Sequence, residues 1–209
     1  GATLDFAGLI GTIGNLQGAG RLTGTRPTQI SAGDFAGVIA GTGGFDKLGA
    51  GTLTLTGANT YSGITTISGG TLRIGAGGQL SGGGVSNHGA LVFARNDTAM
   101  LANAISGTGT LTQAGSGTLI LTGANTHTGL TTIHAGGTLQ IGNGGTSGQI
   151  SGGAVLNNGA LRVDRGDDGG VIRRVEDRRA GDEGVGTRRG DGPDVVGLDA
   201  AVHFEADRL

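Results

Sequence analysis

The sequence has 209 residues, 49 of them Gly, with no Cys, no Trp and a formal net charge of −2. Its Gly content is far above the usual roughly 7%, but collagen is excluded because there is no Gly-X-Y period and only two Pro. The missing Cys excludes a disulfide scaffold and thiolate metal sites, and the net charge argues against binding to nucleic acid. A hydrophobic content of 35% is low for a compact globule and favours an elongated fold, in which each unit buries a thin strip of core.

The sequence contains no recognisable segment for membrane insertion or export. No stretch approaches 18 consecutive apolar residues, and no signal peptide is recognisable. Gly1 is not a natural initiator, so we expect a fragment or a processed product that is soluble as it stands.

Short strands are the first elements that the pattern predicts. Apolar and polar or small residues alternate over 52–56, 71–74 and 90–94, which is typical of half-buried β-strands. The same alternation returns later in the chain, at Leu119/Leu121, Leu139/Ile141 and Leu161/Val163. The segments between them are rich in Gly, Asn and Ser, as turns are, and no helix-length period with caps is present.

These strands belong to an internal repeat. "GTLTLTGANTYSGITTI" at 51–67 returns as "GTLILTGANTHTGLTTI" at 117–133. The similarity extends over 36–95 and 102–165, with small insertions near Ala135 and at Thr146–Gly148 that we expect to lie in turns.

The length of the repeat points to a solenoid. One copy is too long for one coil and suits three coils of about twenty residues. We therefore predict an all-β protein, a right-handed parallel β-helix, in which each strand pairs with its equivalent in the next coil. Leu, Ile and Val would stack inside, and Thr would line the outside or the adjoining turns. A sandwich of hairpins is the alternative, but its Asn-Gly turns occur only at 143–144 and 158–159 and are not matched in the other copy.

Gly and Asn in the turn of each copy are the predicted structural positions. Gly fits where the backbone has a positive φ or packs too closely for a Cβ, and Asn tolerates the left-handed region and can bond its own backbone. The predicted residues are Gly57, Asn59 and Gly63 in the first copy and Gly123, Asn125 and Gly129 in the second.

The repeat also resembles a known family. "GAGTLTLTGANTYSGITTISGGTLRIG", ending at Gly75, is similar to the passenger-associated repeat of bacterial autotransporters, whose pattern runs Gly-Thr-Leu-x-Leu-x-Gly, then Asn-Thr-Tyr-x-Gly-x-Thr-x-Ile. Lys47 lies in the family's lead-in, where Gln113 replaces it in the second copy, and His127 replaces Tyr61. The segment "LIGTIGNLQGAGRLT" resembles the looser coils that precede such repeats.

The resemblance implies a domain organisation and a role. Residues 1–34 would form N-terminal β-helix coils, 35–101 the first repeat, 102–165 the second, and 166–209 a charged tail. The chain would be a stalk or folding segment of a passenger displayed at, or secreted from, the surface of a Gram-negative cell. Its outer-membrane barrel would lie outside this chain, and adhesion to host cells or cell–cell contact would use other parts.

The tail differs in composition from the rest. Residues 1–165 carry seven Lys or Arg and five Asp or Glu, whereas 166–209 carry seven Arg and eleven Asp or Glu. A disordered charged tail, a shifted reading frame and a small separate domain all remain open for this segment.

No catalytic, metal or cofactor site is predicted. His127 and His134 have no nearby acid or Cys and are interpreted as surface residues, and Asp97 and Asp164 as solvated turn residues. The Arg-Gly-Asp triplets at 165–167 and 189–191 lie in or beside the Arg-rich tail, where chance triplets are expected. We therefore expect no enzyme; a carbohydrate-binding or carbohydrate-cleaving β-helix and an inactive truncated fragment are the alternatives.

Overall fold

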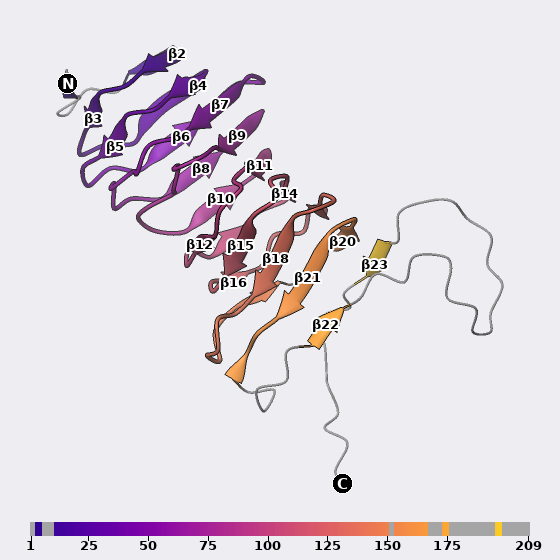
Figure 1. Ribbon diagram of the computed structural model, residues 1–209. Coiled ribbons are helices and arrows are strands. Elements are labelled where there is room, and N and C mark those ends of the chain that lie inside the picture. The colour runs from indigo at the N-terminus through magenta and orange to yellow at the C-terminus, as the bar shows by residue number, and fades with distance from the viewer. Residues whose placement is uncertain (1–2, 6–10, 151–152, 167–172, 176–194, 198–209) are drawn as a thin grey trace, which may run out of the picture.

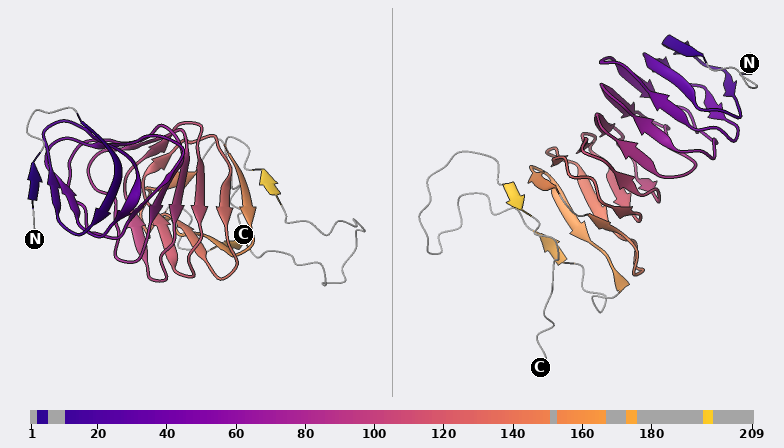
Figure 2. Two further views of the ribbon diagram at one scale, coloured as in Figure 1. Left: turned by 90° about the horizontal axis from the view of Figure 1, so that it is seen from above. Right: turned by 180° about the vertical axis from the view of Figure 1, so that it is seen from behind.

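The computed structural model describes residues 3–5, 11–150, 153–166, 173–175 and 195–197. These residues form a parallel β-solenoid, a rod in which the coils are stacked from the N-terminal to the C-terminal end (Figure 1). Seen from other directions, the strands of successive coils run side by side in long stacks (Figure 2). The predicted parallel β-solenoid is therefore confirmed.

Three stacks of strands form the faces of the rod, and we call them faces A, B and C. Face A consists of β6 (Phe45–Lys47), β8 (Thr65–Ile67), β10 (Val85–Asn87), β13 (Ile105–Ser106), β16 (Ala124–Asn125) and β19 (Gln149–Ile150). Face B consists of β7 (Thr52–Leu55), β9 (Thr71–Ile74), β11 (Ala90–Phe93), β14 (Thr110–Gln113), β17 (Thr131–Ile133) and β20 (Ala154–Asn157).

Face C is regular at both ends and irregular between them. Its strands are β1 (Thr3–Asp5), β3 (Arg21–Thr23) and β5 (Val38–Ala40), and later β12 (Ala99–Leu101), β15 (Thr118–Leu121), β18 (Thr138–Ile141) and β21 (Ala160–Val163). Between β5 and β12 the face is continued by turns around Asn59 and Gln79, joined by a bridge between Ala58 and Gln79. Near the N-terminus, β2 (Thr12–Gly18) pairs with β4 (Thr28–Phe35), and β4 is long enough to pair with both β6 and β7.

The coil length agrees with the predicted value of about twenty residues. On face B, Leu53 pairs with Leu72, which pairs with Leu91, and the chain of partners continues to Leu111, Thr131 and Val155. The step from Thr131 to Val155 is the longest of these. It contains Thr146–Gly148, which lies in a loop, as predicted for an insertion.

The core is a narrow strip of aliphatic side chains that runs along the rod axis. In strands such as β7, β9 and β11 every second residue is buried, because neighbouring side chains of a strand alternate between its two sides. Leu53, Leu72, Leu91 and Leu111 form one ladder with no exposed surface. A parallel ladder beside it begins with Leu55, Ile74 and Phe93. Because identical or similar side chains stack at each level, the core can be extended coil by coil.

The two copies of the repeat are rotated about the rod by one face. In the first copy β6, β7, β8 and β9 alternate between faces A and B, whereas their equivalents β14, β15, β17 and β18 alternate between faces B and C. The reason is the length of the repeat. Three coils after Leu53 the ladder reaches Leu111, but the residue equivalent to Leu53 in the second copy is Leu119. The repeat therefore exceeds three coils by one strand and its turn, and equivalent residues lie about a third of a turn apart.

The tail contributes two short strands to the described structure. Arg173–Val175 (β22) pairs antiparallel with β21, and Val195–Gly197 (β23) pairs antiparallel with β20. The other residues of the predicted 166–209 tail, apart from Gly166, lie outside the described residues.

Candidate functional site: the interior polar set of the repeat

Each repeat places five polar side chains inside the rod, and we call them the interior polar set. All ten are buried, and they occupy equivalent positions in the two copies: Lys47/Gln113, Asn59/Asn125, Tyr61/His127, Thr65/Thr131 and Asn87/Asn157. Buried polar groups are costly unless they are hydrogen-bonded, so their repeated occurrence in a thin core calls for a structural explanation.

Asn59 and Asn125 join three successive coils. The Asn59 Oδ1 accepts from the backbone N–H of Ile39 at 2.9 Å, and its Nδ2 donates to the carbonyl oxygen of Gln79 at 2.8 Å. Asn125 makes the same pair of bonds to the N–H of Ile105 and the carbonyl of Gln149, at 3.0 and 2.9 Å. The side chain thus replaces ladder bonds where the strand is interrupted. This differs from the prediction that these Asn residues bond their own turn: Asn59 bridges coils instead, and Asn125 adds one local bond to Gly123.

Lys47 and Gln113 satisfy carbonyl groups at the turn that leads out of their strand. The Lys47 Nζ donates to the carbonyls of Leu48 at 2.7 Å, Gly49 at 3.0 Å and Gly69 at 3.1 Å, and the last of these belongs to the next coil. Gln113 Nε2 donates to the carbonyls of Gly115 and Gly117 at 3.2 and 2.8 Å. Burial lowers the pKa of the Lys47 ammonium because the charged form loses hydration.

Tyr61 and Thr65 form a buried pair, and His127 and Thr131 form its counterpart. The Tyr61 hydroxyl lies 2.6 Å from Thr65 Oγ1, and burial raises the pKa of Tyr61 to about 12. Its ring meets Phe45 edge to face, with centroids 5.4 Å apart. His127 Nε2 lies 2.8 Å from Thr131 Oγ1.

These observations correct two predictions. His127 is 1% exposed, so it is an interior residue and its interpretation as a surface residue is wrong, whereas His134 is exposed. Thr65 and Thr131 point inward, although Thr was predicted to line the outside or the turns. The alternation within "TTI" explains the error, because the first Thr and the Ile share the inner side of the strand.

Asn87 and Asn157 close the turn that follows their strand. In each case Oδ1 accepts from the N–H two residues on, Gly89 or Gly159, at 3.1 Å. Asn87 also donates to the carbonyl of Thr110 in the next coil, at 2.9 Å. The Lys, Gln and Asn members of the set therefore supply donors and acceptors to backbone groups, whereas the Tyr–Thr and His–Thr members pair with each other.

Comparison with protein-family models identifies the family to which the repeat belongs. The model described as the passenger-associated-transport-repeat matches residues 45–74 and 111–141. The β-solenoid of this chain contains two passenger-associated-transport-repeats. The resemblance to autotransporter passengers is thereby confirmed, and the two matched ranges contain four of the five interior polar positions of each copy. A search of curated proteins and a search of solved structures found no match.

The predicted glycines of the passenger-associated-transport-repeat lie where two coils touch. A Cβ built on Gly57 would overlap the carbonyl oxygen of Gly37, and one on Gly63 would overlap the backbone nitrogen of Gly44. In the second copy, Gly123 and Gly129 face the carbonyl oxygens of Asn103 and Gly109 in the same way. None of the four has a positive φ, so close approach between coils is the reason for glycine here.

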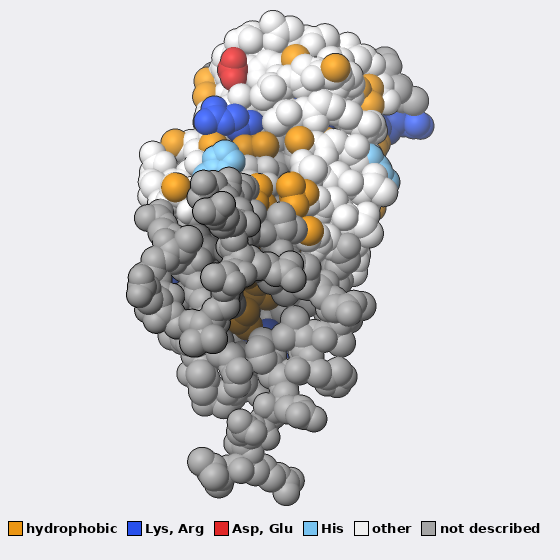
Figure 3. Space-filling view, turned by 90° about the vertical axis from the view of Figure 1, so that its right-hand side faces the viewer, with side chains coloured by type: hydrophobic (Ala, Val, Ile, Leu, Met, Phe, Trp, Pro, Cys, Tyr) orange, Lys and Arg blue, Asp and Glu red, His pale blue; other side chains and the backbone are white. Residues whose placement is uncertain are grey.

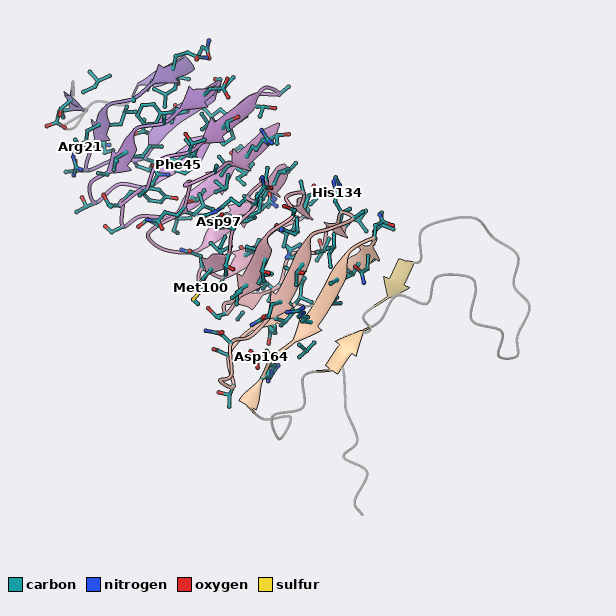
Figure 4. All side chains as sticks on the ribbon, viewed as in Figure 1. Arg21, Phe45, Asp97, Met100, His134 and Asp164 are labelled. Carbon is teal, nitrogen blue, oxygen red and sulfur yellow. The ribbon has the colours of Figure 1, made fainter. Side chains whose placement is uncertain are left out.

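The outer surface of the repeats carries few charged groups, and one view of it shows scattered hydrophobic side chains between uncharged ones (Figure 3). Asp97 is paired with Arg95 through two bonds of 2.8 and 2.6 Å, and Asp164 accepts from Gln140 at 3.2 Å. The two acids lie at separate points along the rod (Figure 4). Within the described ranges, no three His, Cys, Asp or Glu side chains gather into a group that could hold a metal ion.

Two further predicted features can be placed. Of the Arg-Gly-Asp triplets, Arg165 and Gly166 are described and the remaining residues lie outside the described residues. In the part of the chain that the structure describes, no helix has the length and apolar character needed to cross a membrane.

Proposed function

We propose that this chain is a rigid stalk and folding segment of an autotransporter passenger that is displayed at, or secreted from, the surface of a Gram-negative cell. The passenger-associated-transport-repeat supports the passenger assignment, and the architecture supports the mechanical role. Adhesion to host cells or contact between cells would be carried by parts of the passenger outside this chain.

The observation that carries the proposal is the bridging of three coils by one Asn side chain in each repeat. Asn59 accepts a hydrogen bond of 2.9 Å from the Ile39 N–H in one neighbouring coil and donates one of 2.8 Å to the Gln79 carbonyl in the other. A coil that has formed therefore presents unpaired backbone groups and an open hydrophobic ladder to the next coil. Folding can advance along the chain as it leaves the membrane, since each repeat unit contacts only its neighbours.

The second repeat is rotated by one face relative to the first. This rotation favours the role of a stalk rather than that of a surface that binds a ligand at regular intervals. Leu130 is equivalent to Ile64, yet the carbonyl of Ile64 accepts from Phe45 on face A and that of Leu130 accepts from Leu111 on face B. An outer feature of the repeat is thus distributed around the rod, and no single face repeats with every copy. A rod whose outer features do not recur on one face suits a spacer.

The test uses the full-length passenger protein in its own cells. Deletion of residues 45–110 removes one whole repeat and joins Gly44 to Leu111, the equivalent of Phe45. We expect surface exposure to persist, as judged by protease digestion and antibody labelling of intact cells. The rod should shorten by about 16 Å, which is three and a third coils at roughly 4.8 Å each.

A matched control separates repeat length from deletion as such. Deletion of 45–120 extends the cut to Ile120 and joins Gly44 to a strand interior, so it breaks the coil register and should lower surface exposure. The proposal fails if the wild-type repeat region is reached by protease only after permeabilisation, or if both deletions behave alike.

A further inference from the structure

One of the interior positions at which the two repeats differ holds Tyr61 in the first repeat and His127 in the second. Both side chains are 1% exposed and both bond the hydroxyl of a Thr four residues later. The aromatic partner of Tyr61 is Phe45, whereas the equivalent residue in the second repeat is Leu111. The first repeat therefore buries a phenol that is neutral at all ordinary pH values, and the second buries an imidazole, whose unperturbed pKa lies near neutrality.

The imidazole of His127 has one nitrogen with a partner and one without. Nε2 lies 2.8 Å from Thr131 Oγ1, and Nδ1 has no hydrogen-bond partner among the residues that the structure describes. A neutral imidazole suits this site, because Nε2–H can donate to the Thr131 hydroxyl while Nδ1 remains an unprotonated nitrogen. Protonation would add a buried N–H and a positive charge at Nδ1, and neither would be compensated.

The described strands around His127 supply no compensating charge. The strands of its own coil and of the two adjoining coils on faces A and B are β13, β14, β16, β17, β19 and β20, and none contains an Asp, Glu, Lys, Arg or His. His134, which follows β17, is exposed. Burial alone lowers the pKa of His127 below its usual 6.5, since the charged form loses hydration.

We propose that His127 makes the second repeat acid-sensitive, so that mild acid opens the coils around β16 and β17 while the first repeat stays closed. The sensor is the buried imidazole with its unpartnered Nδ1, and the element it controls is the stretch of coil that runs from Asn125 to Ile133. This device gives the rod a defined weak point under acid and is independent of how the chain is exported.

The direction of the pH effect follows from the pKa. A lowered pKa in the folded coil means that the open coil binds more protons, so stability is complete above about pH 6.5 and falls as the pH drops below it. For one proton the opening equilibrium rises by up to about tenfold per pH unit. Between pH 7.5 and 5.0 the expected rise is up to about thirtyfold, since only the part below 6.5 counts.

Hydrogen exchange read by mass spectrometry tests this in the full chain, after correction for intrinsic exchange rates. In the wild type, peptides of 111–141 should lose protection from pH 7.5 to 5.0, and those of 45–74 should not. His127→Tyr, which uses the residue of the first repeat, and His127→Gln, which keeps a hydrogen-bonding group but cannot be charged, should each remove the effect. Tyr61→His should transfer acid sensitivity to the first repeat.

Two results would overturn the proposal. One is an unchanged pH dependence of peptides 111–141 in both His127 variants. The other is an imidazole titration of His127, followed by NMR with the His127→Gln spectrum as the assignment control, at or above pH 6.5. If Tyr61→His fails to fold, the two His127 variants still decide the question.

Discussion

Replacement of Asn59 by Ala should destabilise the solenoid more than any exposed Asn replacement. The Asn59 side chain is 1% exposed and bonds the Ile39 N–H at 2.9 Å and the Gln79 carbonyl at 2.8 Å. Ala would leave both backbone groups without these partners in the interior, and each buried group left unsatisfied costs about 1–3 kcal/mol. The expected loss is therefore about 2–6 kcal/mol, a large part of the roughly 5–15 kcal/mol typical of a domain.

Urea unfolding followed by far-ultraviolet circular dichroism measures this loss, with Asn143→Ala as the control. Asn143 is exposed in the loop after β18, so its replacement should change the free energy of unfolding by roughly 0.5 kcal/mol or less. Asn125→Ala should resemble Asn59→Ala, because Asn125 makes the equivalent bonds. If Asn59→Ala unfolds at the same urea concentration and with the same slope as Asn143→Ala, coil bridging by Asn does not stabilise the rod and the reasoning is refuted.

Two further pairs of variants test contacts between coils by the same urea assay. Gly57→Ala should cost about 1–3 kcal/mol or prevent folding, because its Cβ would overlap the Gly37 carbonyl. The control Gly136→Ala, at φ +84° with no heavy atom within 4 Å of the added Cβ, should cost only about 1 kcal/mol. Equal losses for the two variants would contradict the close-approach argument. Lys47→Met should cost about 2–4 kcal/mol because three hydrogen bonds to carbonyl groups are lost. Lys47→Gln should cost less than half of that, since Gln113 bonds the carbonyls of the equivalent turn in the second repeat. A Gln variant as unstable as the Met variant would refute the role of Lys47 in satisfying these carbonyls.

Much of the repeat's fold could be predicted from sequence because side-chain alternation and stacking are local rules. The inward positions of Leu53, Leu72 and Leu91 follow from alternation alone, and the spacing of Gly and Asn turns gives a coil near twenty residues. The four predicted glycines proved to be positions of close approach, one of the two reasons foreseen for them. The prediction that Thr lines the outside or the adjoining turns was wrong for Thr65, because alternation with Ile67 places both side chains inside.

The sequence by itself determined that the chain repeats, that its elements are short strands, and that like residues stack in parallel coils. These properties depend on neighbours along the chain and on a spacing that can be counted. Only the tertiary structure decided which backbone groups Asn59 and Lys47 satisfy, that His127 is buried, and that the second repeat is rotated by one face. Those outcomes depend on contacts between coils, such as the bond from Ile39 to Asn59, and on the one strand and turn by which the repeat exceeds three coils.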